Sequence, residues 1–208
     1  MSLARAERAA LSNTLEKTDP GQPTLCAGWT AHDLLAHLLV RERQPWASGG
    51  IAIPLLAPLT QQAMRGYADT PWQQMVDELR SGPPAWSPYR INRVDEAANG
   101  AELFVHHEDV RRGLPGWEPR EPDGTRDAAL WSLVRRSGRW LYRRSPVGVV
   151  VRRPAGEQAV VKTGTGLVTI DGEPGEILLH AFGREAARVD LRGEPTDVAA
   201  FEAAARGA

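Results

Sequence analysis

Two side chains that can bind a metal lie one helical turn apart near the middle of the chain. Glu102 and His106 fall in the run from Asn99 to Asp109, whose pattern predicts a helix. Residues four apart on a helix project from the same face, so the carboxylate and the imidazole can share a divalent cation. His37 lies in another predicted helix and supplies a third candidate ligand. Three protein ligands leave a coordination position open for water or substrate, which is typical of catalytic rather than structural zinc.

The stripe that contains this pair favours a buried position. Asn99, Glu102, His106 and Asp109 form a narrow polar stripe with apolar residues on both sides, so it is expected to face the interior of a helical bundle. Unpaired charges are costly there, and a metal would satisfy them. A hydrogen-bonded polar cluster without a metal explains the same stripe. From this helix alone, both interpretations stay open.

His37 falls at the edge of the apolar side of its own helix. A single histidine at such a position more often packs and hydrogen-bonds than binds a metal, so His37 becomes a candidate ligand only together with the second helix. Asp33 and Asp109 are candidate partners that would orient the imidazoles from behind. No residue is assigned as a general base, because the sequence places none of the remaining acids well enough.

Three further features carry weaker signals. Arg41 shares a row with Asp33 and His37 and is a speculative anion-binding residue for a carboxylate-bearing substrate or a thiol cofactor. Cys26 is either a reactive thiol near a helix N-terminus or, more plainly, a small buried hydrophobic residue. The pair Arg135-Arg136 is expected to be a solvated helix face rather than an anion site.

Composition, net charge and cysteine count exclude several classes of protein. The chain has 208 residues, 42% of them hydrophobic, and a formal net charge of -1, which gives no electrostatic footprint for nucleic acid or an anionic membrane. A single cysteine excludes an intramolecular disulfide and a cysteine-rich zinc site. The first 16 residues lack the apolar run of a signal peptide, and the apolar stretch 51–59 is too short and proline-broken to span a bilayer. We therefore expect a cytoplasmic protein with no nucleic-acid or membrane partner.

Hydrophobic periodicity divides the chain into a helical part and a mixed part. Helices are predicted at 2–17, 30–45, 59–66, 71–80, 95–112 and 124–142. Beyond Ser145-Pro146, strands are predicted at 147–151, 160–161, 167–170 and 187–191, with helices at 176–182 and 196–205. Gly164-Thr165-Gly166 is expected to be a hairpin turn. The sequence thus predicts an α+β protein with a helical domain at 1–143 and a small α+β domain at 144–208.

Several segments resemble motifs of a known family. The run from Leu25 to Leu38, which contains Cys-Ala-Gly-Trp-Thr and ends on His37-Leu, is similar to the second-helix motif of the DinB-like metal-binding family. More specifically, it resembles the actinobacterial branch that includes mycothiol-dependent maleylpyruvate isomerase. Glu102-Leu-Phe-Val-His106-His-Glu-Asp109 resembles the second ligand motif of that branch. Residues 171–184 and 189–193 resemble its small C-terminal domain.

The resemblance implies a fold, a metal and a chemistry. It implies an N-terminal four-helix bundle and a C-terminal domain with a sterol-carrier-like fold. It also implies a metal, usually zinc, held by His37, Glu102 and His106. Two nitrogens and one carboxylate suit zinc, although iron, nickel and manganese accept the same donors. The run 104–112 points to a metal-binding subgroup distinct from the isomerase itself.

The same resemblance implies the function of a mycothiol-dependent enzyme, either a thiol-dependent isomerase or a thiol S-transferase. Its partners would be a small thiol and an electrophilic small-molecule substrate, and it would act as a monomer or a homodimer. Two alternatives remain at this point. One is a non-catalytic module that binds a metal or a small molecule, and the other is a protein whose site no longer binds metal.

Overall fold

The computed structural model of the chain describes residues 2–44, 46–47 and 57–204. It divides into two compact units, Met1–Pro119 and Arg120–Ala208, and each unit is described here by itself. Within these residues the protein is α+β, as the sequence predicts, with all strands in the second unit. Residues 51–56 of the proline-broken apolar stretch lie outside the described residues.

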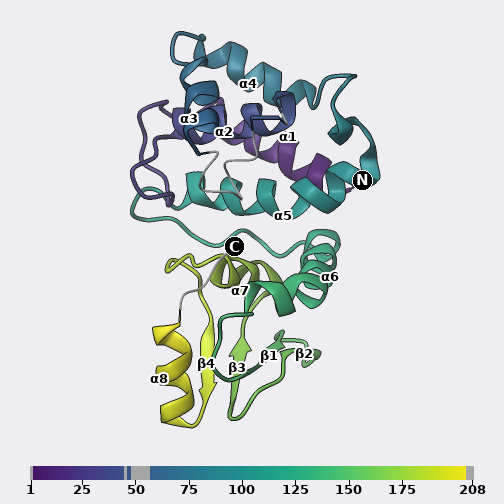
Figure 1. Cartoon of the computed structure of the whole chain (residues 1–208), viewed down its shortest axis with the longest axis vertical. Helices are drawn as coiled ribbons and strands as arrows, with labels where there is room; N and C mark the ends of the chain where they lie inside the picture. Colours follow the sequence, from purple (N-terminus) through teal and green to yellow (C-terminus); the bar gives the residue numbers. More distant parts are fainter. Residues whose placement is uncertain (1, 45, 48–56, 205–208) are drawn as a thin grey trace. The chain divides into compact units, whose positions relative to one another are not determined.

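The N-terminal unit consists of helices joined by loops. Its elements are α1 (Leu3–Leu15), α2 (Ala31–Arg43), α3 (Ala57–Arg65), α4 (Trp72–Ser81), the short 3-10 helix η3 (Pro88–Arg90) and α5 (Asn92–Arg111). Helix α1 packs along α5 and against α4, and α2 packs against α3 and α4 (Figure 1). The five predicted α-helices are present, with ends that differ by a few residues.

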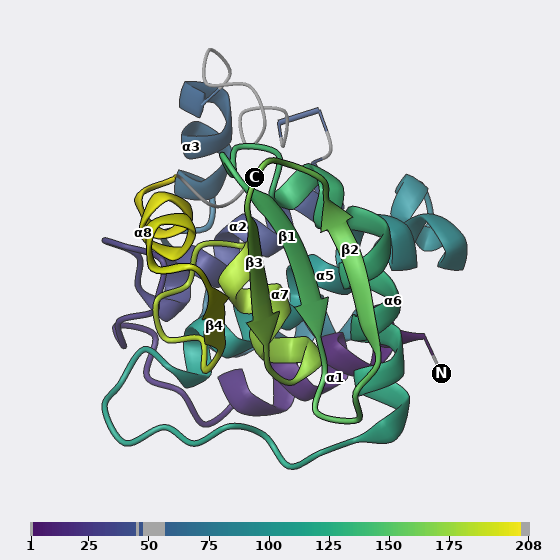
Figure 2. The same ribbon diagram turned by 90° about the horizontal axis from the view of Figure 1, so that it is seen from below.

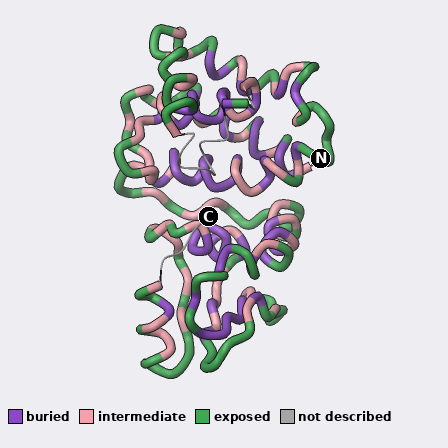
Figure 3. Tube along the Cα trace, in the orientation of Figure 1, coloured by how far each residue is buried: buried purple, intermediate pink, exposed green. Residues whose placement is uncertain are grey.

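Leucines form most of the core of this unit. Buried residues are concentrated along α1, α2 and α5, as Figure 3 shows. The largest fully buried side chains of the cluster are Leu11, Leu15, Leu34, Leu35, Leu38, Leu39, Met75, Leu79 and Leu103. This apolar packing fixes α2 and α5 and so determines where their polar side chains lie.

The C-terminal unit is a four-stranded sheet with helices. Its elements are α6 (Gly124–Leu141), β1 (Gly148–Arg152), β2 (Gln158–Lys162), β3 (Leu167–Asp171), α7 (Pro174–Ala181), β4 (Asp190–Gly193) and α8 (Pro195–Ala203). The strand order is β2-β1-β3-β4. Figure 2 looks onto the sheet, with α7 and α6 behind it and α8 beside β4. No helix in the described part of the chain is both long and apolar enough to cross a bilayer.

The boundary between the units differs from the one that composition suggests. The sequence changes character at 143/144, whereas the compact units divide after Pro119. The difference is α6, whose buried face includes Leu130, Val134 and Leu141 and which packs against α7 and β2. A helix whose apolar face covers a sheet belongs with that sheet, even when its sequence pattern resembles that of the preceding helices.

The residues at 163–166 do not form the hairpin turn that the sequence predicts. Strands β1 and β2 form the hairpin, and β3 pairs in parallel with β1 on its other side. The connection from β2 to β3 therefore passes the end of β1 instead of joining neighbours. Gly148 through Val151 are all buried, whereas β2 has exposed positions. A strand buried on both faces takes the central place, and this places β2 at the edge.

Candidate metal centre

The structure brings together the three residues that the sequence selects as metal ligands. The Nε2 atom of His106 lies 3.2 Å from Glu102 Oε1, and His37 Nε2 lies 3.5 Å from the same oxygen. The two imidazole rings are 5.2 Å apart between centroids. One ligand atom from each residue lies within 4.8 Å of the others. Two nitrogens from α2 and α5 and one oxygen from α5 thus face one point.

The group lies inside the unit and opens on one side. His37 is 5% exposed and His106 is 7% exposed. The Glu102 side chain is the most accessible of the three, with 19% of its surface exposed. Solvent therefore reaches the group at its carboxylate. The ring of Trp29 packs against the imidazole of His37, with 5.1 Å between centroids, and fixes its orientation.

Asp109 lies behind His106, as the sequence predicts. Its Oδ2 atom is 2.9 Å from His106 Nδ1, and Asp109 has no exposed surface. An imidazole that donates its Nδ1 proton to a carboxylate presents the lone pair of Nε2 on its opposite side. That side faces Glu102. Asp109 therefore has the position of a residue that orients a metal-binding histidine.

Cys26 is a further member of this cluster, and sequence reasoning missed its role. The thiol donates a hydrogen bond to Asp109 Oδ2 over 3.2 Å, and its sulfur is 3.9 Å from His106 Nδ1. Cys26, His106 and Asp109 also form a second group of potential ligand atoms. The expected small buried hydrophobic residue is thus a half-buried hydrogen-bond donor.

A tight turn before α2 places Cys26 at this position. The Trp29 amide donates to the Cys26 carbonyl over 2.9 Å, and Gly28 has a positive φ of 78°, which glycine adopts without strain. The Leu25 amide donates to the main-chain carbonyl of Asp109 over 3.0 Å, which attaches the turn to α5. The pattern Cys-x-Gly-Trp indicates the turn. No local sequence pattern indicates that this turn is hydrogen-bonded to α5, which is distant in sequence.

Asp33 is not brought to the imidazoles by its hydrogen bonds. Its carboxylate accepts the main-chain N–H of Thr30 over 2.9 Å and the Thr30 hydroxyl over 2.7 Å, while its own N–H donates to Thr30 Oγ1. This reciprocal arrangement is a capping box that begins α2. Asp33 therefore caps the first turn of its own helix, and the expected orienting role of Asp33 finds no support in these contacts.

Arg41 lies next to the candidate centre, and two of its three guanidinium nitrogens donate hydrogen bonds to other residues. Its Nε donates to Asn99 Oδ1 over 2.9 Å, and its Nη2 donates to the Ala98 carbonyl over 2.8 Å. The third guanidinium nitrogen is 4.0 Å from Glu102 Oε1. Arg41 thus contributes positive charge beside Glu102 from a fixed position.

The contacts of Arg41 continue into a buried charge network. Asn99 donates to Asp95 Oδ1 over 2.8 Å, and Asp95 accepts from Arg8 over 2.7 Å. The same guanidinium donates to Glu42 over 2.6 Å. These side chains join α1, α2 and α5. The polar stripe of α5 predicts that Asn99 faces the interior. Its connection to charged residues of α1 and α2 depends on tertiary packing, which the stripe does not show.

Electrostatics at the group favour a bound cation. Burial lowers the pKa of His37. Burial also acts to raise the pKa of Glu102, but hydrogen bonds from His106 and His37 hold that pKa well below its usual range. Burial opposes the charged form of His106, yet hydrogen bonds to Asp109, Cys26 and Glu102 raise its pKa well above the ordinary value. The buried carboxylate of Asp109 and the partly exposed carboxylate of Glu102 lie on either side of one imidazole and stabilise a positive charge there, and a set of two nitrogens and one oxygen fits zinc.

Comparison with known proteins supports the fold. No protein-family model and no curated protein sequence matches the chain. The crystal structure of the mycothiol-dependent maleylpyruvate isomerase does match, with 16% identity, a TM-score of 0.59 and coverage of 92% of this chain and 91% of that chain. A crystal structure of a histidine-to-alanine mutant matches with 17% identity, a TM-score of 0.56 and the same coverage. The chain therefore has the fold of this α+β enzyme across nearly its whole length.

Proposed function

We propose that this protein binds one divalent metal, zinc, through His37 Nε2, Glu102 Oε1 and His106 Nε2. The observation that carries the proposal is the convergence of these three atoms, all within 4.8 Å of one another, on two helices. In this proposal α1, α2, α4 and α5 form a DinB-like four-helix bundle. The C-terminal unit is then the small sterol-carrier-like domain that accompanies such a bundle.

We further propose that the centre serves a mycothiol-dependent reaction, either an isomerisation or a thiol S-transfer to an electrophilic substrate. A divalent metal supplies a Lewis acid that favours the deprotonated form of a bound thiol. Asp109 holds the ring of His106 in one tautomer, and Arg41 places a fixed positive charge beside Glu102. Three protein ligands leave room for the thiol, and the fold is similar to that of an isomerase described as mycothiol-dependent.

A non-catalytic metal- or small-molecule-binding module is the second candidate. The contacts of Arg41 favour it, because a guanidinium committed to Asn99 and the Ala98 carbonyl is less available to a substrate anion. The expected anion-binding role of Arg41 therefore stays a prediction. The enzyme and the metal-binding form of the module share the metal and differ in whether a thiol reaches it.

Metal content of the purified protein tests the shared part. We expect about one zinc per chain by plasma mass spectrometry, and a loss of most of it in His37→Ala, Glu102→Ala and His106→Ala. His32→Ala is the matched control, because His32 stacks on Trp72 with 6.4 Å between ring centroids and is not a member of the group. A wild-type protein that takes up no metal after zinc is added back would contradict the thiol-dependent enzyme and the metal-binding form of the module.

Thiol binding separates the two candidates. In protein loaded with cobalt(II), addition of mycothiol is expected to produce a sulfur-to-cobalt charge-transfer band in the near ultraviolet. Methylated mycothiol, which lacks the free thiol, is the control. A cobalt spectrum that mycothiol leaves unchanged, in protein that binds cobalt through the same three residues, would support the non-catalytic module.

A further inference from the structure

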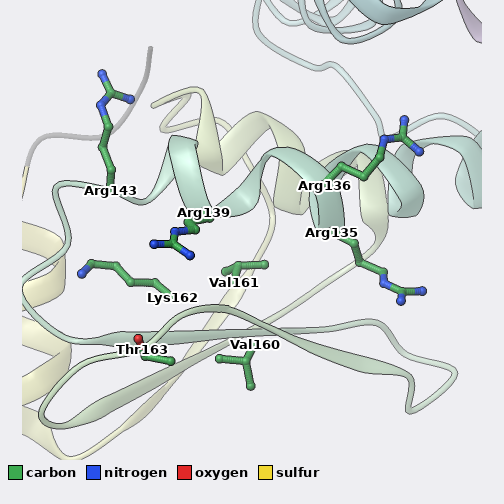
Figure 4. Close-up of a pocket in the computed structure, with 8 residues that line it drawn as sticks. All are labelled: Arg135, Arg136, Arg139, Arg143, Val160, Val161, Lys162 and Thr163. Carbon is green, nitrogen blue, oxygen red and sulfur yellow. The ribbon is translucent and has the colours of Figure 1, made fainter.

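A hollow of about 560 Å³ between α6 and β2 is lined by basic side chains. Figure 4 shows the residues that surround it. They are Arg135, Arg136, Arg139 and Arg143 of α6, Val160, Val161 and Lys162 of β2, and the neighbouring Thr163. All of them belong to the C-terminal unit, whereas the candidate metal ligands belong to the N-terminal unit. The volume is in the range of sites for small molecules.

A close approach of helix and strand creates this arrangement. Gly138 is buried on the face of α6 that packs against β2, and a Cβ atom at Gly138 would lie 2.6 Å from Val161 Cγ1. Only a residue without a side chain permits this distance. The residues that follow each of these two, Arg139 and Lys162, both reach the hollow. In Figure 4 their side chains extend to the same side of it.

The other basic residues have local partners. Arg135 lies 3.4 Å from Glu157, and Arg143 donates to the Trp140 carbonyl over 2.8 Å while its guanidinium covers the Trp140 ring. Arg136 donates to the Ser132 hydroxyl. The sequence-based expectation of a solvated helix face for Arg135-Arg136 agrees with these exposed contacts.

Arg139 and Lys162 differ from their neighbours. Among the residues that the structure describes, neither side chain has a hydrogen-bond or ion-pair partner. Arg139 also lies four residues from Arg135 and four from Arg143, and like charges at this helical spacing repel one another. An anion in the hollow would pair with two free cations and relieve this repulsion.

We propose that the hollow binds a small organic phosphate with more than one negative charge. Arg139 supplies a planar fork of donors, Lys162 a compact positive charge, and the exposed Thr163 a hydroxyl donor, which together suit phosphate oxygens. Val160, 66% exposed, gives an apolar surface for the organic part of the ligand. Only these two cations of the hollow lack a described partner, and the net charge of the chain is -1, which favours a small ligand over nucleic acid.

Calorimetric titration with fructose 1,6-bisphosphate tests this proposal, with fructose as the uncharged control. We expect saturable binding that weakens with added salt, and an increase in Kd of roughly tenfold or more in the double variant Arg139→Gln/Lys162→Gln. The variant Lys17→Gln/Arg144→Gln removes the same charge outside the hollow and should keep the wild-type Kd. Circular dichroism checks that both variants are folded. If Arg139→Gln/Lys162→Gln is not folded, the single variant Lys162→Gln takes its place in the titration.

Three results would overturn the proposal. They are no saturable binding of the bisphosphate at millimolar concentration, an equal loss in the two double variants, and binding of a single-stranded oligonucleotide in place of the bisphosphate. Titration of His37→Ala keeps this test independent of the metal centre. That variant should bind the bisphosphate as the wild type does, even if it binds no zinc, so failure of one proposal leaves the other intact.

Discussion

At the scale of single residues, Asp109 connects the imidazole of His106 to the thiol of Cys26 by hydrogen bonds. It accepts from the imidazole Nδ1 and from the Cys26 thiol, and no part of it is exposed. Its negative charge is therefore directed at the ring rather than screened by solvent. The chemistry of the proposed centre would thus depend on residues that need not touch a metal.

Replacing Asp109 by Asn should weaken zinc binding about 10- to 100-fold, because a carboxylate that accepts from a metal-binding histidine raises the basicity of that ligand. Competition with a chromophoric zinc chelator measures the affinity. Asp33→Asn is the matched control. It should leave the zinc affinity unchanged and lower the stability by about 1 kcal/mol, because it alters the capping box of α2. Equal effects of the two substitutions on zinc affinity would contradict the role assigned to Asp109.

The sequence predicts the members of this group that lie close together along the chain better than those that lie far apart. Glu102 and His106 lie on one predicted helix, so their shared face follows from spacing alone. His37 is a weaker candidate on its own helix, and the family resemblance supports it, because periodicity does not show which helices become neighbours. The hydrogen bond from Cys26 to Asp109 joins residues 83 apart in sequence and depends on a turn attached to α5, which no local pattern reveals.

At the scale of elements, buried charges tie three helices together. Arg8 of α1 pairs with Glu42 of α2 and Asp95 of α5, with side chains at most 6% exposed. Removing one member of such a group leaves the others charged and buried. Arg8→Met should therefore destabilise the protein by roughly 3–5 kcal/mol in urea unfolding. A loss below about 1 kcal/mol would show that solvent reaches Glu42 and Asp95 more freely than this packing indicates.

The effect of Arg8→Met should also depend on pH. Burial raises the pKa of Glu42 despite the attraction of Arg8, so the folded state binds this proton more strongly than the unfolded state. Such a group favours folding below its unfolded pKa, and that contribution is lost as pH rises through the folded pKa. Without Arg8, the pKa of Glu42 should rise further, because the attraction that stabilises its charged form is lost. The stability difference between wild type and variant should thus be smaller near about pH 5 than near about pH 8. A difference that is constant with pH would contradict this account.

The contact between α6 and β2 gives a second prediction for the elements. In an exposed helix Gly→Ala stabilises by about 1 kcal/mol, but at Gly138 the added Cβ would overlap Val161. Overpacking of this kind costs about 1–3 kcal/mol, so Gly138→Ala should lower stability overall. Thermal unfolding measures the change. The double variant Gly138→Ala/Val161→Ala should recover part of the loss, and a stabilised single variant would show that β2 moves away without cost.

Topology is the part of the fold that sequence patterns predicted least. Strand positions followed from β-branched runs, but the place of β1 between β2 and β3 depends on which strand is buried on both faces. The assignment of α6 to the second unit has a similar cause. Its periodicity shows an amphipathic helix, whereas the surface that covers its apolar face is known only once the sheet is formed.

At the scale of the whole molecule, the proposed ligands come from one unit only. Zinc that binds the folded state more tightly than the unfolded state stabilises the elements that hold it. In hydrogen exchange followed by mass spectrometry, zinc should slow exchange in α2 and α5 and leave β1 and β3 unchanged. His106→Ala is the control and should show no zinc effect. Slower exchange in β1 and β3 would indicate that the metal also acts on the C-terminal unit.

The separation of His37 and Glu102 by 65 residues has a consequence for the order of events during synthesis. His37 leaves the ribosome before Glu102 and His106. The nascent chain therefore cannot complete the proposed centre before α5 emerges. All three ligands precede Pro119, and domains generally fold as units with the N-terminal one first. Zinc can therefore be acquired while the sheet is still being translated.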